Sequence, residues 1–293
     1  MRPAPPANAP VNALTVDVED FFHVQAFADV IPRAAWETLP RRVEHNTERL
    51  LELCDRAGVV GTFFTLGWVA ERHPALVRRI VAGGHELASH GFAHQRVDGQ
   101  APEDFRDDIL RARLLLEDTG GVAVGGYRAP TFSVGPRTPW AFKTLAETGH
   151  RYSSSIYPVR HDLYGSPDAP RVPYRHAGTE LWEFPMTTLR VWSRNLPCSG
   201  GGYFRLLPYP LFRFLLRRAN AAQGAGLFYT HPWEIDPGQP RVPGARRLSR
   251  LRHYTNLDKT FTRLGRLFGD FAWDRMDRVH AQLLEPAPPP GAA

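Results

Sequence analysis

Short β-prone apolar runs alternate with segments of helical periodicity along most of this chain. The β-prone runs are residues 13–18, 61–66, 85–88, 126–128, 152–156, 181–186 and 227–230. The helical segments are residues 41–57, 69–82, 103–119, 138–148 and 209–222. Alternation of strand and helix predicts a parallel sheet with helices outside it, so we expect an α/β fold of the barrel type.

The chain has 293 residues, which is enough for one large domain, and its two ends differ from the rest. Residues 1–10 and 286–293 are rich in Pro and Ala and cannot build a core, which predicts disordered tails. We therefore expect one domain over residues 11–285, in which residues 236–285 form a C-terminal extension.

Four stretches depart from the simple alternation. Residues 160–178 are rich in Pro, His, Arg and Tyr, and residues 197–204 place three glycines before two aromatic residues. Both patterns predict loops over the mouth of the barrel. Within the extension, residues 257–271 and 273–284 return to a helical period, which predicts two further helices.

Composition narrows the class of protein. No apolar run is long enough to span a bilayer and no secretory segment follows Met1, so we expect a cytoplasmic location. The only cysteines are Cys54 and Cys198, so a metal site must use His and carboxylate side chains. The net charge of +6 comes mostly from Arg, but no zinc-finger spacing or RNA-binding aromatic signature accompanies it, so we expect no nucleic-acid partner.

Three acidic residues follow the first β-prone run. Asp17 and Glu19 share one face at strand spacing, and Asp20 comes next. One carboxylate of such a cluster can hold a cation while its neighbour takes a proton. An acidic strand end is also a common helix cap or solvated turn, so the cluster needs partners elsewhere in the chain before it indicates a site.

His90 and His94 supply candidate partners directly after the run at 85–88. They are four residues apart, and on one helical turn both imidazoles can face a single ion. Two histidines and one carboxylate leave positions open to water and substrate, which is typical of a catalytic site and suits Zn²⁺ or another borderline divalent ion. A His-x-x-x-His pair is by itself a weak signal, and we interpret His73 and His85 as incidental.

Arg128 and His231 also lie at the ends of β-prone runs. The guanidinium of Arg128 can pair with Asp17, lower its pKa and orient it as a base, although a lone Arg is usually a surface residue. His231 is either a core histidine or the acid that protonates a leaving group.

In this order the Asp, the His-x-x-x-His pair, the Arg-x-Pro segment and the last His resemble the polysaccharide deacetylases of the NodB-homology superfamily, carbohydrate esterase family four. The segments TVDVEDFFHV, SSSIYPV, CSGGGYFRLLP, FYTHPWEID and RHYTNLDKT are similar to those of deacetylases encoded beside exosortase and exopolysaccharide-export genes. The resemblance implies a distorted (β/α)7-type barrel with a C-terminal helical extension.

For the metal, the resemblance implies that His90 and His94 are ligands to a divalent ion, with Zn²⁺ first and Co²⁺ or Ni²⁺ as alternatives. The third ligand is either Glu19 or Asp20, because this chain lacks the two adjacent aspartates of the usual pattern, and Gly91 replaces the usual Ser or Thr. Both departures resemble the branch of allantoinase-like enzymes and a bacterial peptidoglycan deacetylase, which favours Glu19.

For catalysis, the resemblance implies that Asp17 is the base, that Arg128 tunes it and that His231 is the general acid. The backbone N–H of Thr131 would help to hold an oxyanion. Tyr157 and Trp233 are candidates for stacking on sugar rings, although each is equally typical of core or loop packing.

These expectations define one enzyme and two alternatives. We expect a metal-dependent hydrolase that removes N-acetyl groups from amino sugars of a bacterial exopolysaccharide or its precursor. The alternatives are an allantoinase-like small-molecule amidase and a non-catalytic glycan-binding scaffold. The expected partner is an N-acetylated glycan, with peripheral contact at the inner membrane face or with polymer-assembly proteins as a further expectation.

Overall fold

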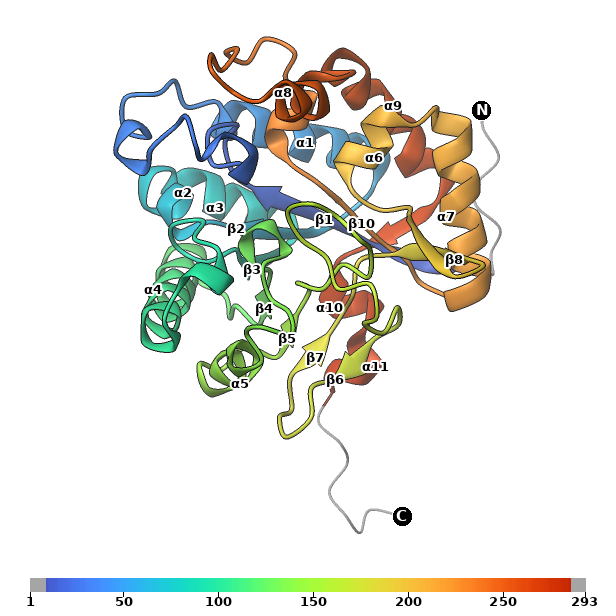
Figure 1. Ribbon diagram of the computed structural model, residues 1–293, viewed down its shortest axis with the longest axis horizontal. Helices are drawn as coiled ribbons and strands as arrows, with labels where there is room; N and C mark the ends of the chain where they lie inside the picture. The colour runs from blue at the N-terminus through green and yellow to red at the C-terminus, as the bar shows by residue number, and fades with distance from the viewer. Residues whose placement is uncertain (1–8, 286–293) are drawn as a thin grey trace.

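The computed structural model describes residues 9–285, so most of both predicted tails, residues 1–8 and 286–293, lies outside the described residues. Within the described part, nine strands form one sheet (Figure 1). They are β1 (Val11–Val18), β2 (Thr62–Thr65), β3 (Glu86–Ser89), β4 (Gly126–Tyr127), β5 (Tyr152–Ser153), β6 (Tyr174–Arg175), β7 (Trp182–Glu183), β10 (Leu227–Thr230) and β11 (Ala272–Asp274).

The order of hydrogen-bonded strands is β10-β1-β2-β3-β4-β5-β7-β6, and β11 pairs with β1. All of these pairs are parallel except the one between β6 and β7. Within residues 9–285 the order begins at β10 and ends at β6, so the sheet curls into a half barrel and stays open. The predicted α/β fold is therefore confirmed, as a barrel that does not close.

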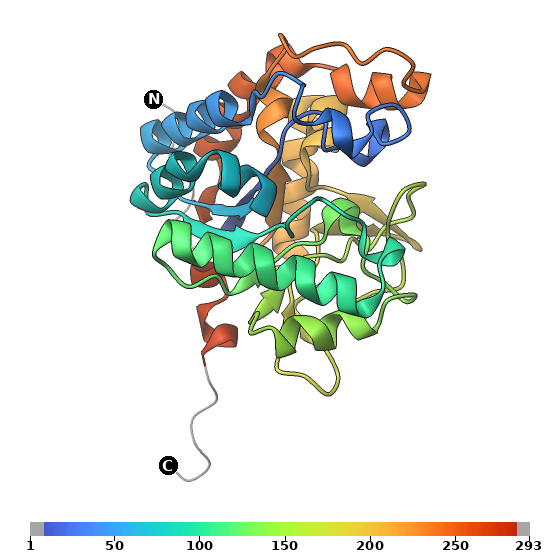
Figure 2. The same ribbon diagram turned by 90° about the vertical axis from the view of Figure 1, so that its left-hand side faces the viewer.

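Helices connect the parallel strands and surround the sheet, as Figures 1 and 2 show. They are α1 (Val43–Ala57), α2 (Gly67–Arg72), α3 (Pro74–Ala82), α4 (Pro102–Gly120), α5 (Trp140–Glu147), α6 (Gly201–Leu206), α7 (Tyr209–Gln223), α8 (Arg247–Tyr254), α9 (Leu257–Asp270), α10 (Met276–Val279) and α11 (Ala281–Leu284). None of the helices in residues 9–285 has the length and apolar character needed to cross a membrane.

The predicted helix at 69–82 is two helices, because Pro74 begins α3 and disfavours helical backbone at the residue before it. The predicted helix at 273–284 was wrong: its first residues pair with β1 as β11, and only the short α10 and α11 follow. The predicted loop at 197–204 contains the start of α6.

An antiparallel hairpin, β8 (Thr188–Val191) and β9 (Arg194–Pro197), precedes α6 and was missed in the sequence. In its turn Trp192 has a φ of 50°, and the pattern of apolar residues in a sequence does not predict such a left-handed backbone conformation.

The largest core cluster lies where β1 and β2 meet the helices that follow them. Seven of the eight residues of β1 are buried, as expected for a strand covered on both faces. On α1, Leu50, Leu51 and Cys54 turn one buried face toward the sheet. This packing fixes the carboxyl ends of the strands, where the polar side chains lie.

Candidate active site

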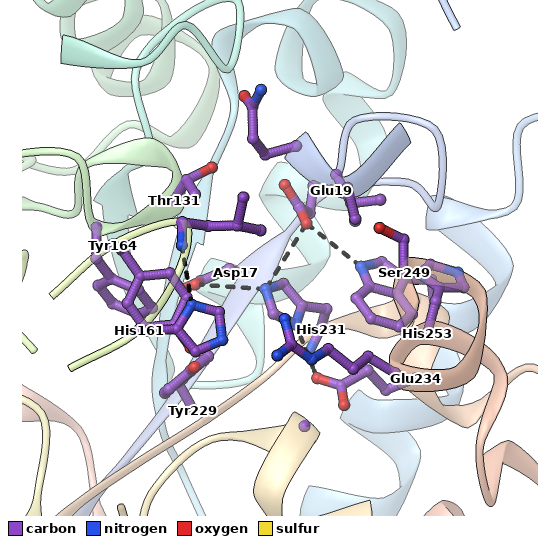
Figure 3. A pocket seen from close by; sticks show the side chains of 18 of the residues that line it. Asp17, Glu19, Thr131, His161, Tyr164, Tyr229, His231, Glu234, Ser249 and His253 are labelled. Carbon is purple, nitrogen blue, oxygen red and sulfur yellow. Dashed lines mark hydrogen bonds and ion pairs between the residues drawn. The ribbon is translucent and has the colours of Figure 1, made fainter. Parts of the chain in front are cut away.

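The four segments singled out in the sequence meet at one edge of the sheet. Asp17 lies near the end of β1. His90 directly follows β3, Arg128 directly follows β4, and His231 directly follows β10. Because these strands are parallel neighbours, their carboxyl ends meet at the same edge. A cavity of about 380 Å³ opens there, lined by Asp17, His90 and His231 among others (Figure 3).

Glu19, His90 and His94 each aim one ligand atom at a common region, and these atoms lie within 4.8 Å of one another. Nδ1 of His90 is hydrogen-bonded to the carbonyl oxygen of Arg128 at 2.8 Å, which leaves Nε2 for the cluster. Oε2 of Glu19 lies 2.7 Å from Nε2 of His94, but the orientation is not that of a hydrogen bond, and this buried oxygen has no hydrogen-bond partner among the described residues.

Two imidazoles and a carboxylate with an unsatisfied buried oxygen are a donor set that fits a divalent cation. Burial by itself would raise the pKa of Glu19, but the neighbouring His94, His231 and His90 outweigh it and hold that pKa well below its usual range. Burial lowers the pKa of His90 to about 4, so its ring is neutral and able to bind a metal.

The loop that carries the two histidines requires Gly91. Its φ is +74°, and a Cβ at this position would lie 2.8 Å from Oδ2 of Asp108. That carboxylate, on α4, accepts hydrogen bonds from the backbone N–H groups of Phe92 and Ala93. Asp108 therefore anchors the loop between His90 and His94, a role that the sequence alone did not indicate.

Asp20 faces away from the cluster. Its carboxylate accepts hydrogen bonds from the backbone N–H groups of Phe21, Arg42 and Val43, the last two at the start of α1. Burial raises the pKa of Asp20 to about 6 against the lowering effect of these bonds. Of the two candidates for the third ligand, the structure thus places Glu19 with the histidines and gives Asp20 the position of a helix cap.

Arg128 is fully buried and fixed from several sides. Its Nη1 lies 2.6 Å from Oδ1 of Asp17 and 2.8 Å from the hydroxyl of Thr15, and its Nε and Nη2 donate to the carbonyl and hydroxyl oxygens of Ser154 at 3.0 Å. The guanidinium also lies over the ring of Phe64, 4.1 Å from its centre. Arg128 therefore holds one oxygen of Asp17 and leaves the other toward the cavity.

His231 is held by a buried ion pair that was not predicted from the sequence. Its Nδ1 lies 2.7 Å from Oε1 of Glu234, whose Oε2 accepts a 2.6 Å bond from Arg205. Nε2 of His231 is 3.8 Å from Asp17 and 3.6 Å from Glu19. Burial would lower the pKa of His231, but the bond to Glu234 and the nearby carboxylates raise it to about 9.

The one available signal for Glu234 was its spacing, since an acid three residues after a histidine at a strand end can turn back to it. Its partner Arg205 is 29 residues earlier in the chain, just after the segment 197–204 that was predicted to be a loop. Gly201 makes room for this pair, because a Cβ there would lie 2.0 Å from the Glu234 carboxylate.

Thr131 lines the cavity in left-handed backbone, with a φ of 56°, which is rare for a β-branched residue and common at functional sites. Trp233 also borders the cavity, but it stacks between His231 and His253 and donates to Oε1 of Glu19 at 3.3 Å. Tyr157 is buried, donates to the carbonyl of Ser199 and is absent from the lining, so it is placed for packing rather than for stacking on a sugar.

The outer wall of the cavity comes from the predicted mouth loop and from the C-terminal half of the chain. His161, Leu163 and Tyr164 border the cavity, in agreement with the prediction for residues 160–178. The rest of this wall comes from Tyr203 and Leu206 of α6 together with Ser249, Arg252 and His253 of α8.

Two family models match the chain. Residues 29–152 match the model described as polysaccharide deacetylase, and residues 154–281 match a domain of unknown function, DUF3473. The first match includes the segments of His90, His94 and Arg128, and the second includes that of His231.

Similar proteins include a peptidoglycan deacetylase of Helicobacter pylori, 29% identical over 113 residues, which cover 39% of this chain and 38% of that protein. A chitooligosaccharide deacetylase of Bradyrhizobium sp. is 35% identical over 85 residues, 29% of this chain and 39% of that protein. The chain thus spans less than two fifths of the length of either relative. A crystal structure of a proposed polysaccharide deacetylase from Mycobacterium smegmatis has the same fold, with a TM-score of 0.57 and 24% identity over 98% of this chain and 97% of that one.

Proposed function

Since this chain belongs to the polysaccharide deacetylase family, we propose that it is a metal-dependent hydrolase that removes N-acetyl groups from amino sugars of a bacterial exopolysaccharide or its precursor. The observation that carries the proposal is the division of labour between two carboxylates two residues apart. Asp17 is paired with Arg128 and faces His231, whereas Glu19 joins His90 and His94.

A divalent ion held by Glu19, His90 and His94 would supply Lewis acidity, which polarises the acetamide carbonyl and makes a water molecule more acidic. Nitrogen and carboxylate ligands with room for water suit Zn²⁺ first, with Co²⁺ and Ni²⁺ as alternatives.

Asp17 acts as the base that removes a proton from the attacking water. Arg128 holds Oδ1 at 2.6 Å, so Oδ2 keeps a fixed direction toward the cavity and toward His231, 3.8 Å away. Because Arg128 is itself bound to Ser154 and Thr15, the base is positioned before the substrate arrives.

His231 donates the proton that the departing amine needs when the C–N bond breaks. Glu234 binds Nδ1, which directs Nε2 into the cavity and stabilises the charged ring. The backbone N–H of Thr131, at a left-handed turn that lines the cavity, would donate to the oxyanion of the tetrahedral intermediate. Water adds to the carbonyl carbon, and the products are acetate and a free amino sugar.

The substrate class rests on two supports. The two relatives named above are a peptidoglycan deacetylase and a chitooligosaccharide deacetylase, and we extend an N-acetylated glycan substrate to this chain. The choice of an exopolysaccharide or its precursor rests on the resemblance of several segments to deacetylases of exopolysaccharide loci. An N-acetylated glycan is thus the proposed partner, met in the cytoplasm or at the inner membrane face.

A second candidate is an allantoinase-like amidase, favoured by the place of Glu19 two residues after Asp17. Purified protein with Zn²⁺ would be given N-acetylglucosamine oligomers and, separately, allantoin. We expect acetate from the oligomers and no turnover of allantoin. Turnover of allantoin alone would establish the amidase, and metal binding without any turnover would favour a glycan-binding scaffold.

A further inference from the structure

Helix α8 exposes two leucines to solvent. The side chains of Leu248 and Leu251 are 51% and 61% exposed, and at i and i+3 they lie on the same face of the helix. Exposed leucines are ordinary on protein surfaces, so this pair gains its meaning from the charges around it and from its place beside the cavity.

Arginines surround this pair. Residues 241–257 contain Arg241, Arg246, Arg247, Arg250 and Arg252 and no Asp or Glu. Arg246 pairs with Asp29 and Arg252 pairs with Asp162. Arg247 and Arg250, at i and i+3 on one face of the helix, are exposed and have no ion-pair partner among the described residues. Helix α8 therefore combines an apolar face with a positive one, which is the pattern of a helix that lies in a membrane interface.

The position of α8 links this surface to the cavity. Ser249 and Arg252, which flank Leu248 at i+1 and i+4 on the helix, line the cavity, and so do the exposed Leu163 and Leu206. In Figures 1 and 2, α8 lies at the outer edge of the molecule, above α6. The leucines thus stand beside the entrance through which a substrate must pass.

We propose that Arg247, Leu248, Arg250 and Leu251, here called the α8 surface, dock the protein on an anionic lipid bilayer. The leucines enter the headgroup region while the arginines bind lipid phosphates. This orients the entrance of the cavity toward the membrane and, resting on the proposed function, selects an N-acetylated sugar held at the bilayer by a lipid anchor.

The test is sedimentation of the full chain with vesicles. Vesicles of phosphatidylethanolamine and phosphatidylglycerol supply the anionic surface, and vesicles of phosphatidylcholine supply the neutral one. We expect binding to the anionic vesicles, weaker at high salt, and a loss of about fivefold in the partition coefficient for each of Arg247→Gln and Arg250→Gln. The double substitution of Leu248→Ser and Leu251→Ser should weaken binding further.

Helix α7 offers a matched control, because it also exposes two apolar side chains at i and i+3, Leu211 and Phe214, followed by Arg217 and Arg218. Substituting these four with Ser and Gln should leave vesicle binding unchanged. Equal loss from the α7 control, or no binding to anionic vesicles by the unaltered protein, would overturn the proposal. Binding to a soluble anionic polysaccharide but not to vesicles would also overturn it and assign the α8 surface to a polyanionic glycan.

Acetate release from soluble oligomers separates this proposal from the proposed function. The α8 variants should deacetylate soluble oligomers at the unaltered rate and lose activity only on a vesicle-anchored N-acetylated sugar. Vesicle binding without any acetate release would support docking through the α8 surface and contradict the proposed function. Acetate release with unchanged activity of the α8 variants on the anchored sugar would support the proposed function and contradict docking through the α8 surface.

Discussion

Nδ1 of His231 lies 2.7 Å from Oε1 of Glu234, and the other oxygen of this buried carboxylate is bound by Arg205. A histidine held in this way presents the same nitrogen to the cavity at all times. The position of His231 at the end of β10 thus depends on a pair of charges that comes from the following turn and from α6.

Glu234→Gln should show this dependence directly. We expect kcat/KM to fall about 10- to 100-fold, since the neutral amide no longer stabilises the charged ring of His231. The substitution also leaves Arg205 without its partner, so the free energy of unfolding should drop as well. Arg205→Lys is the control, because it keeps a cation beside Glu234. It should lower stability with a smaller effect on rate, and an equal loss of rate in both variants would argue against a role for Glu234 in orienting His231.

Two substitutions distinguish a metal ligand from a helix-capping residue, Glu19→Gln and Asp20→Asn. We expect Glu19→Gln to abolish stoichiometric metal binding, because its Oε2 is the unsatisfied oxygen beside His94. Asp20→Asn should bind metal normally and lose about 1–2 kcal/mol of stability at the start of α1. Metal content after dialysis and the unfolding midpoint in urea measure the two effects. Loss of metal from Asp20→Asn alone would reverse the assignment.

Gly91→Ala tests the loop between the histidines. The left-handed backbone and the 2.8 Å approach to Asp108 both oppose a Cβ, so metal affinity should fall along with stability. Gly121→Ala is the matched control: its φ is +66°, but no atom lies within 4 Å of the added Cβ, and it is far from the ligands in sequence. This variant should lose about 1 kcal/mol of stability and keep its metal affinity. Equal metal affinity in both variants would contradict the role given to Gly91.

Glu86 predicts a pH dependence of stability that is unrelated to the cavity. Burial, with the charge of Asp277, raises its pKa from 4.5 to about 7 despite hydrogen bonds from Thr62 and Tyr152. Between these values the folded state keeps a proton that the unfolded state has lost, so this contribution to stability is full below pH 4.5 and is lost as pH rises through about 7.

Urea unfolding of the unaltered protein and of Glu86→Gln, at several pH values between 4.5 and 8, measures this contribution. The free energy of unfolding of the unaltered protein should decline relative to that of the variant as pH rises. Burial lowers the pKa of His85 to about 4 and that of His150 to about 3, so the contribution of these histidines to stability rises with pH. It is the same in both proteins and cancels when their free energies of unfolding are compared. A constant difference would show that Glu86 ionises normally in the fold.

Much of the fold was predictable because its signals are local. The apolar run that forms β10 and the helical periods of α1 and α4 were placed to within two residues of their observed ends. Parallel strands bring their carboxyl ends together, so the meeting of Asp17 with His231 followed from the predicted topology.

What the sequence could not supply were contacts between distant segments. β11 is a strand because it pairs with β1, some 260 residues away, although its local pattern is helical. The first strand of hairpin β8–β9 lies against α7, where the side chain of Gln223 donates to the carbonyl of Thr188. Asp20 and Glu19 are neighbours in the sequence, and only the packing of α1 against β1 assigns one of them to a helix end.

The most direct measurement of the central claim is acetate release from N-acetylglucosamine oligomers by metal-stripped protein, with and without added Zn²⁺ or Co²⁺, alongside Asp17→Asn. The account predicts release that returns with metal and is abolished by Asp17→Asn, while that variant still binds metal through Glu19, His90 and His94. Release that is unaffected by metal removal, or that persists in Asp17→Asn, would contradict it.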